Sequence, residues 1–233
     1  MKLSISLLAT LLCAMMALTG CAEEAASPAP QLPECIADVP QPDGPCTGVI
    51  PDVNHCIPET GGEAVDPTVL GSTQPAWKLQ DIQPQSCGYE QVYGLDQFHG
   101  TPTMVVLLRA SCGFCQAQAE KLQEMKFELE AESVDVHFSI LNEKAFPGAG
   151  APPVHKFTER CNFPIFQDTE VVDAWALHGG IKDDFYFYDA EGILQNFISD
   201  RASVNLSTAD GYNTIKNAVL SVAGVEIPEA DPE

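Results

Sequence analysis

The stretch TMVVLLRASCGFC at residues 103–115 decides the fold of this chain. Its apolar part, Met104 to Leu108, is a continuous run of the kind that forms a strand buried on both faces of a sheet. A helical pattern follows from about Phe114 to Ala131, with apolar residues at three- and four-residue spacing. These apolar positions are Ala119, Leu122, Met125 and Leu129. The sequence therefore predicts a buried strand that leads directly into a helix, with two cysteines at the junction.

Cys112 and Cys115 are separated by two residues, where the predicted helix begins. A helix N-terminus offers unpaired N–H groups and partial positive charge, and both favour a thiolate. We expect Cys112, at the cap position, to attack a substrate disulfide. Cys115, one turn further in and more buried, would then resolve the mixed disulfide. Electron flow in the opposite direction would oxidise substrate thiols. Arg109 is a candidate for supporting the thiolate, and nearby carboxylates would oppose it.

Two other interpretations of this cysteine pair stay open, a structural disulfide and half of a zinc site. A zinc site of this kind needs a second close cysteine pair, and the sequence has none. Haem attachment would require histidine directly after the pair, where the chain has Gln116. The strand before the pair and the helix after it favour redox chemistry, with no metal and no cofactor expected.

The rest of residues 76–225 completes one domain. Strands are expected at residues 91–95, 134–141, 163–166, 185–188 and 193–198, and helices at residues 154–161, 171–177 and 208–223. The last two strands form a hairpin through the turn at residues 189–192. Strands that alternate with helices and end in a hairpin predict an α/β fold, in which a mixed sheet is flanked by helices.

The N-terminus indicates export. Lys2 precedes an apolar run from Leu3 to Leu18, which is too short to span a bilayer and has the length of a secretory signal. The run ends in Leu-Thr-Gly-Cys at residues 18–21, which looks like a bacterial lipobox. We therefore expect residues 1–20 to be a lipoprotein signal peptide and Cys21 to be lipidated. The anchor would hold the protein at a bacterial membrane, either the outer membrane facing the periplasm or the cell surface. An ordinary signal peptide cut nearby is the alternative.

Residues 21–75 differ in composition from the domain, because they are rich in Pro, Gly, Asp and Glu and contain no aromatic residue. Such a segment buries little apolar surface, so we expect a flexible, Pro/Gly-rich tether. It carries Cys35, Cys46 and Cys56, which either staple a loop cluster or link to Cys87 or Cys161. Outside the cytosol such disulfides persist. Residues 226–233 form an acidic tail.

The charge balance excludes one class of function. The chain has 33 acidic and 11 basic residues and a net charge of −22. Nucleic-acid binding needs a basic surface, so no nucleic-acid partner is expected. The expected partners are protein or small-molecule disulfides and thiols, a redox partner protein, and the membrane through the lipid anchor.

Several short motifs together resemble the N-terminal domain of the selenoprotein P family. They are Gln-Pro-Ala-Trp at residues 74–77, the strand and motif at 105–112, Trp175, Lys-Asp-Asp-Phe at 182–185, and Tyr-Asp at 188–189. The resemblance covers about residues 77–198 and implies a thioredoxin-like fold and a redox function. In the animal proteins the first position of the redox motif is selenocysteine, whereas this chain has Cys112. Their selenocysteine-rich tail has no counterpart in this sequence, so the resemblance does not imply selenium transport.

The chain also departs from ordinary thioredoxins, which carry a cis-proline facing the redox pair. The corresponding place falls at about Asp183, within Ile-Lys-Asp-Asp at residues 181–184, and no proline is available there. This leaves the substrate class open. We expect Asp183 or Asp184 to lie close to Cys115 and to accept its proton, and the alternative is a solvated turn.

The leading hypothesis is a membrane-tethered thiol–disulfide oxidoreductase that uses Cys112 and Cys115. A thiol peroxidase, in which peroxide oxidises Cys112 and Cys115 resolves it, would need the same pair. A non-enzymatic surface module, in which the pair is a permanent disulfide, is the third possibility.

Overall fold

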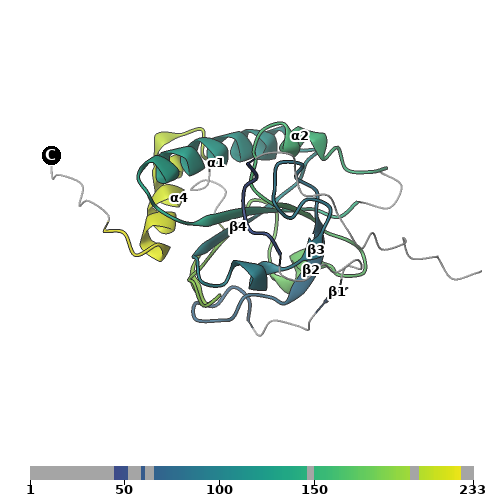
Figure 1. The fold of residues 1–233 in the computed structure, drawn as a ribbon, viewed down its shortest axis with the longest axis horizontal. Coiled ribbons are helices and arrows are strands. Elements are labelled where there is room, and N and C mark those ends of the chain that lie inside the picture. Colours follow the sequence, from purple (N-terminus) through teal and green to yellow (C-terminus); the bar gives the residue numbers. More distant parts are fainter. Residues whose placement is uncertain (1–44, 52–58, 61–65, 146–149, 200–204, 227–233) are drawn as a thin grey trace, which may run out of the picture. The chain divides into compact units, whose positions relative to one another are not determined.

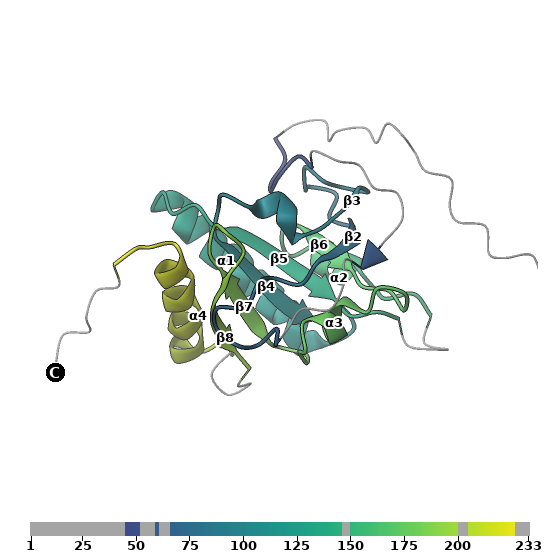
Figure 2. The same cartoon turned by 90° about the horizontal axis from the view of Figure 1, so that it is seen from below.

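A computed structural model describes residues 45–51, 59–60, 66–145, 150–199 and 205–226 of the chain (Figures 1 and 2). In this part the strands are β1 (Glu59–Thr60), β2 (Trp77–Asp81), β3 (Val92–Tyr93), β4 (Thr103–Leu108), β5 (His137–Asn142), β6 (Ile165–Gln167), β7 (Phe185–Tyr188) and β8 (Leu194–Ile198). The helices are η1 (Leu95–Phe98), α1 (Gly113–Ala131), α2 (His155–Thr158), α3 (Ala174–Leu177) and α4 (Ala209–Val222). The strands form one mixed sheet in the order β1-β2-β6-β5-β4-β7-β8, and β3 pairs with β2.

Strand β4 lies in the interior of the sheet, and all six of its residues are buried. It pairs in parallel with β5, from Thr103 opposite His137 to Leu108 opposite Asn142, and antiparallel with β7. A parallel pair needs a long crossover, which α1 supplies, whereas β7 and β8 need only a tight turn. The predicted strand-to-helix unit and the predicted hairpin are both confirmed.

Each face of the sheet has its own hydrophobic core because successive residues of β4 point to opposite faces. Met104, Val106 and Leu108 pack in a cluster with the buried side chains of α1 and α4. Figure 1 shows these two helices on the same side of the sheet. Val105 and Leu107 pack in a second cluster that is rich in aromatic side chains from β2, β3, η1 and β7. With helices packed on the sheet, the predicted α/β, thioredoxin-like fold is confirmed.

Some elements were missed or have other bounds than predicted, and two cases have a clear physical reason. Strand β2 was missed, because its sequence WKLQD has few apolar residues and places Asp81 in the core. The strand predicted at residues 134–141 begins only at His137. Helix α1 ends in a turn in which Ser133 has a φ of 60° and Val134 donates to the carbonyl of Leu129, so residues 133–136 cannot pair with β4.

The folded part of the chain begins before residue 76. Cys46 forms a disulfide with Cys87. Residues 71–74 lie beside the start of β8 and the turn before it, where the N–H of Gly71 donates to the carbonyl of Leu194 and the N–H of Gln74 donates to the carbonyl of Gly192. Part of the segment expected to be a tether is therefore attached to the domain, because a disulfide and strand-like hydrogen bonds offset its poor apolar content.

The predicted signal peptide, Cys21, Cys35 and Cys56 lie outside the described residues, as does nearly all of the predicted acidic tail. In the part of the chain that the structure describes, no helix has the length and apolarity needed to cross a membrane.

Candidate active site

Cys112 and Cys115 lie at the start of α1, as the sequence predicts. Cys112 is the N-cap residue, with extended backbone angles (φ −96°, ψ 118°), and its thiol is half-buried. Cys115 lies in the first turn of the helix and is buried. Both side chains are free thiols in this structure. The more accessible sulfur is thus the one at the helix N-terminus.

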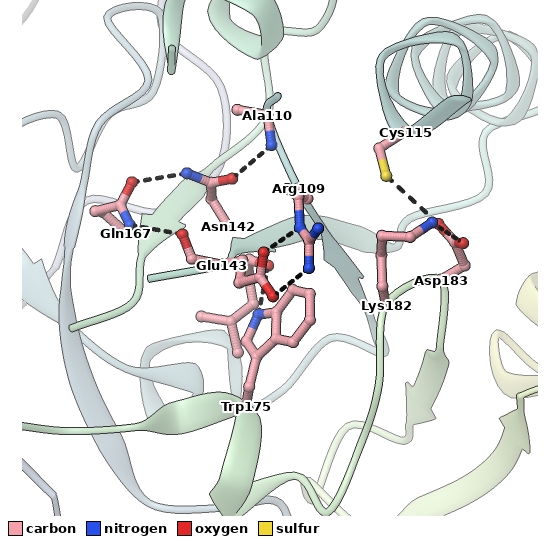
Figure 3. A network of polar contacts seen from close by, with 10 residues as sticks. Arg109, Ala110, Cys115, Asn142, Glu143, Gln167, Trp175, Lys182 and Asp183 are labelled. Atoms are coloured by element: carbon pink, nitrogen blue, oxygen red, sulfur yellow. Dashed lines mark hydrogen bonds and ion pairs between the residues drawn. The ribbon is translucent and has the colours of Figure 1, made fainter. Parts of the chain in front are cut away.

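The loop between β4 and α1 is held in place by polar contacts that sequence reasoning missed. The backbone N–H of Ala110 donates to the Oδ1 atom of Asn142 over 3.0 Å, and the Nδ2 atom of Asn142 donates to Gln167 over 2.7 Å (Figure 3). The side chain of Gln116 donates to the carbonyl of Ala110 over 2.9 Å. Asn142 ends β5, the parallel neighbour of β4. A polar residue at that position is a signal that could have identified it.

Arg109 contacts a carboxylate. Its guanidinium donates two hydrogen bonds to Glu143, one of them over 2.7 Å, in a bidentate ion pair (Figure 3). These hydrogen bonds, which outweigh the effect of partial burial, raise the pKa of Arg109 above its ordinary value. The electrostatic effect of Arg109 on the two thiols is reduced because its charge is already paired. The ion pair joins Arg109, which follows β4, to Glu143, which follows β5, and the backbone of Arg109 forms a hydrogen bond that lowers the pKa of Cys115.

The turn at residues 181–184 brings Asp183 to Cys115. The thiol of Cys115 donates to the Oδ1 atom of Asp183 over 3.5 Å, and Lys182 forms an ion pair with the same carboxylate (Figure 3). Asp183 is 1% exposed and Asp184 is 2% exposed, so the alternative of a solvated turn is wrong. Asp184 has different contacts, because its carboxylate accepts hydrogen bonds from the N–H of Ile181 and from Ser199. Of the two candidate aspartates, only Asp183 has a hydrogen bond to a cysteine among the described residues.

The backbone explains why Asp183 is so close to the redox pair. Its φ is 76°, in the left-handed region that aspartate and asparagine tolerate better than most residues. The N–H of Asp183 donates to the carbonyl of Leu107 over 2.8 Å, and the N–H of Leu107 donates to the carbonyl of Asp184 over 3.0 Å. The turn is thus fastened to the strand that leads into Cys112. No peptide bond in the described residues is cis.

The two thiols differ in acidity. Burial, together with the hydrogen bond to Cys112 and the nearby charge of Asp183, raises the pKa of Cys115 to about 12. Burial alone would also raise the pKa of Cys112. It is outweighed by hydrogen bonds from Cys115 and by the positive charge of Lys182, so the pKa of Cys112 lies below its ordinary value. Cys112 therefore loses its proton at a lower pH than Cys115.

The chain matches a known protein family. The family described as "Selenoprotein P, N terminal region" matches residues 68–207, which is more than half of the chain. The chain belongs to this selenoprotein P N-terminal family. Its match to human selenoprotein P is 30% identical over 145 residues, which covers 59% of this chain and 34% of that protein. Selenoprotein Pb of Danio rerio is 26% identical over 122 residues, covering 52% and 42%. The chain spans about a third of the length of most curated relatives it matches.

Solved structures similar to this member of the family include a putative protein disulfide isomerase from Bacteroides thetaiotaomicron. It is 12% identical, with a TM-score of 0.49, and the match covers 70% of this chain and 93% of that one. A secreted Mycobacterium tuberculosis disulfide oxidoreductase is 19% identical, with a TM-score of 0.45 and coverage of 62% and 94%. Among the described residues of this chain, no three His, Cys, Asp or Glu side chains gather as a metal site would require.

Proposed function

We propose that this protein is an extracytoplasmic, membrane-tethered thiol–disulfide oxidoreductase that works through Cys112 and Cys115. The observation that carries the proposal is the pair of thiols at the N-terminus of α1, one half-buried and one buried beside a carboxylate at 3.5 Å. A structural disulfide has no use for two thiols of different acidity, or for a buried ion pair next to one of them. An exchange reaction uses both features.

In the reducing direction, the thiolate of Cys112 attacks one sulfur of a substrate disulfide. A bond forms between Cys112 and that sulfur, the substrate S–S bond breaks, and the other substrate sulfur leaves as a thiolate. Cys115 then gives its proton to Asp183 and attacks the sulfur of Cys112. The Cys112–Cys115 disulfide forms, the mixed disulfide breaks, and the second substrate thiolate leaves. The oxidising direction is the same sequence in reverse.

Asp183 is suited to accept that proton. The carboxylate oxygen already accepts a hydrogen bond from the Cys115 thiol, which is the reach that a general base needs. Burial and the charge of Asp183 raise the pKa of Cys115, so at neutral pH its thiolate is too scarce to attack quickly without a base. The carboxylate itself is buried and paired with Lys182, which offsets part of the cost of keeping a charge in the protein interior.

We propose a location outside the cytosol. The Cys46–Cys87 disulfide supports it, since such bonds persist in oxidising compartments. The apolar N-terminus and the lipobox-like sequence before Cys21 support a lipid anchor on a bacterial membrane. Radiolabelled palmitate should enter the wild-type protein and not the Cys21→Ala variant. Equal labelling, or no labelling of either protein, would contradict the anchor. The proposed partners are disulfides and thiols of proteins or small molecules, and a redox partner protein that regenerates the pair.

The decisive experiment compares the wild type with Cys112→Ser in two assays, reduction of insulin disulfides and consumption of hydrogen peroxide. An oxidoreductase shows Cys112-dependent insulin reduction, and any peroxide consumption is much slower. The reverse ratio would assign the protein to the thiol peroxidases. If neither assay depends on Cys112 and only denaturing reduction opens a Cys112–Cys115 disulfide, the protein is a non-enzymatic module.

A further inference from the structure

Lys182 has an unusual environment for a lysine. Only 18% of its side chain is exposed, although lysines are among the residues least often buried. Its ammonium group forms an ion pair with Asp183 and lies 5.6 Å from the centre of the Phe114 ring. Phe114 is one of the two residues between the redox cysteines. The lysine therefore joins the turn that carries Asp183 to the first turn of α1.

In the described part of the chain, the charged and titratable groups at this site come from three segments. Helix α1 contributes the thiols of Cys112 and Cys115, which both interact electrostatically with the lysine. The turn contributes Asp183 and also Asp184, whose carboxylate accepts hydrogen bonds from Ile181 and Ser199. Arg109, which follows β4, acts electrostatically on the same two thiols and is ion-paired with Glu143. The positive charge of Lys182 thus faces two groups that change charge during disulfide exchange, the Asp183 carboxylate and the Cys112 sulfur.

We propose that Lys182 is a positioning residue whose ammonium group is shared between two anions, the Asp183 carboxylate and the thiolate that forms at Cys112. This inference rests on the proposed function. While Cys115 keeps its proton, Asp183 is negative and holds the lysine. When Asp183 takes the proton, the carboxylate becomes neutral and no longer competes for the ammonium group.

The charge balance of the resolving step shows what this sharing achieves. The S–H bond of Cys115 breaks, an O–H bond forms on Asp183, and the negative charge moves from the carboxylate to the Cys115 sulfur. That sulfur attacks Cys112, the mixed disulfide breaks, and the substrate sulfur leaves with the electron pair and the negative charge. The departing sulfur was bonded to Cys112, so its charge appears about 2 Å from the Cys112 sulfur. Lys182 keeps all its protons and stabilises the departing thiolate just when Asp183 has become neutral.

The same sharing operates in the reduced enzyme, where it can be measured directly. The experiment uses the full-length protein with Cys115→Ser, so that Cys112 is the only redox-site thiol that titrates. The ionisation of Cys112 is followed by thiolate absorbance at 240 nm and by the rate of alkylation as a function of pH. Lys182→Met keeps an aliphatic side chain against Phe114 and removes the charge, whereas Lys182→Arg keeps the charge.

The prediction compares the effect of Lys182→Met on Cys112 in two proteins, one with Asp183 and one with Asp183→Asn. With Asp183 present, Lys182→Met should leave about tenfold less Cys112 thiolate at a pH below the pKa. In the Asp183→Asn background, Lys182→Met should reduce the fraction of Cys112 thiolate by a factor at least about threefold larger. The reason is that the lysine is then no longer shared with a carboxylate. Lys182→Arg should restore most of the thiolate in both backgrounds.

Three results would overturn the inference: no effect of Lys182→Met on Cys112, an equal effect in both backgrounds, or no rescue by arginine. Lys182→Gln provides a second neutral variant should the methionine variant melt at a lower temperature than the wild type. Failure of the proposed function looks different. In that case the wild type would reduce no disulfide substrate, while the titration of Cys112 would still report whether Lys182 is shared.

Discussion

Replacing Asp183 with asparagine removes the proposed proton acceptor and the carboxylate that pairs with Lys182, and it keeps the turn. Asparagine has nearly the same shape, tolerates the left-handed backbone at this position, where φ is 76°, and keeps an acceptor oxygen near the Cys115 thiol 3.5 Å away. The substitution therefore tests the charge of the carboxylate and its ability to take a proton, with the turn preserved.

Two opposite effects determine how much the substitution changes the rate of resolution by Cys115. In the reduced protein the pKa of about 12 leaves about one Cys115 in 10⁵ as a thiolate at pH 7. In the mixed disulfide Cys112 no longer contributes to that raised pKa, whereas burial and the charge of Asp183 still do. Removing the negative charge lowers that pKa, because the carboxylate no longer repels the thiolate. Even if the pKa falls to about 10, only about one molecule in 10³ is a thiolate at pH 7. The gain in thiolate is thus about 10²-fold, whereas a general base contributes about 10²- to 10⁴-fold, so we expect resolution to slow by about tenfold at pH 7, within a range that extends to about 10²-fold.

The assay is a single turnover with a chromophoric disulfide, 5,5′-dithiobis(2-nitrobenzoate). Release of the first nitrothiolate reports attack by Cys112, and release of the second reports resolution by Cys115. In the variant, the second rate should rise about tenfold per pH unit between pH 6 and 9, because it follows the free thiolate. In the wild type it should vary less with pH. Asp173→Asn is a matched control, because Asp173 also has a left-handed backbone, with φ 49°, and an ion pair, with Lys144. Equal second rates in Asp183→Asn and the wild type across this pH range would refute the role of Asp183.

Three further predictions concern stability. Asn142→Ala leaves the buried N–H of Ala110 without its acceptor, which should lower the free energy of unfolding by about 1–3 kcal/mol in a urea titration; an unchanged midpoint would contradict the role of Asn142. His178 is fully buried, and burial lowers its pKa to about 3, so the folded state disfavours the protonated ring. The unfolded state binds the proton more readily, and the free energy of unfolding therefore decreases as pH falls from about 6.5 toward 3. Between pH 6.5 and 5 this loss should be about 2 kcal/mol, and His178→Gln should lack it; an identical pH slope in this variant would exclude His178 as the cause. Breaking the Cys46–Cys87 disulfide by a double serine substitution opens a loop with a sequence separation of 41. This change should cost about 4 kcal/mol of unfolding free energy by the chain-entropy estimate; a loss below about 1 kcal/mol would mean that residues 45–51 add little to the domain.

The sequence predicts the parts of this fold whose signals are local. Strand β4 is a run of apolar residues, α1 has helical periodicity, and β7 is an aromatic run before a turn, so each could be located without the structure. Strand β2 lacks such a signal. Its buried Asp81 is stabilised by hydrogen bonds from Tyr93, Gln83 and the N–H of Ile165, and two of those partners lie more than ten residues away in the sequence.

The candidate site also has features that a local sequence pattern predicts and features that depend on distant contacts. The proposed order of attack, Cys112 before Cys115, follows from their spacing at a helix start, which is a local pattern. The approach of Asp183 to Cys115 could be expected from the place of the missing proline. Its burial could not, because it depends on contacts with Lys182 and with Leu107 on another element. Asn142 and Glu143 were missed because they act on the redox loop from a neighbouring strand.

The hydrogen bonds between residues 71–74 and β8 have a consequence for how the protein behaves at high concentration. A strand at the border of a sheet presents open N–H and C=O groups, and another copy of the chain can pair with them. Here the N–H groups of Gly71, Leu194 and Gln74 are already used within one molecule. A chain shortened to begin at residue 76 would keep the redox pair and lose this cover. Self-association of the shortened protein is then expected, beside the lower stability that follows from losing Cys46 and its disulfide with Cys87.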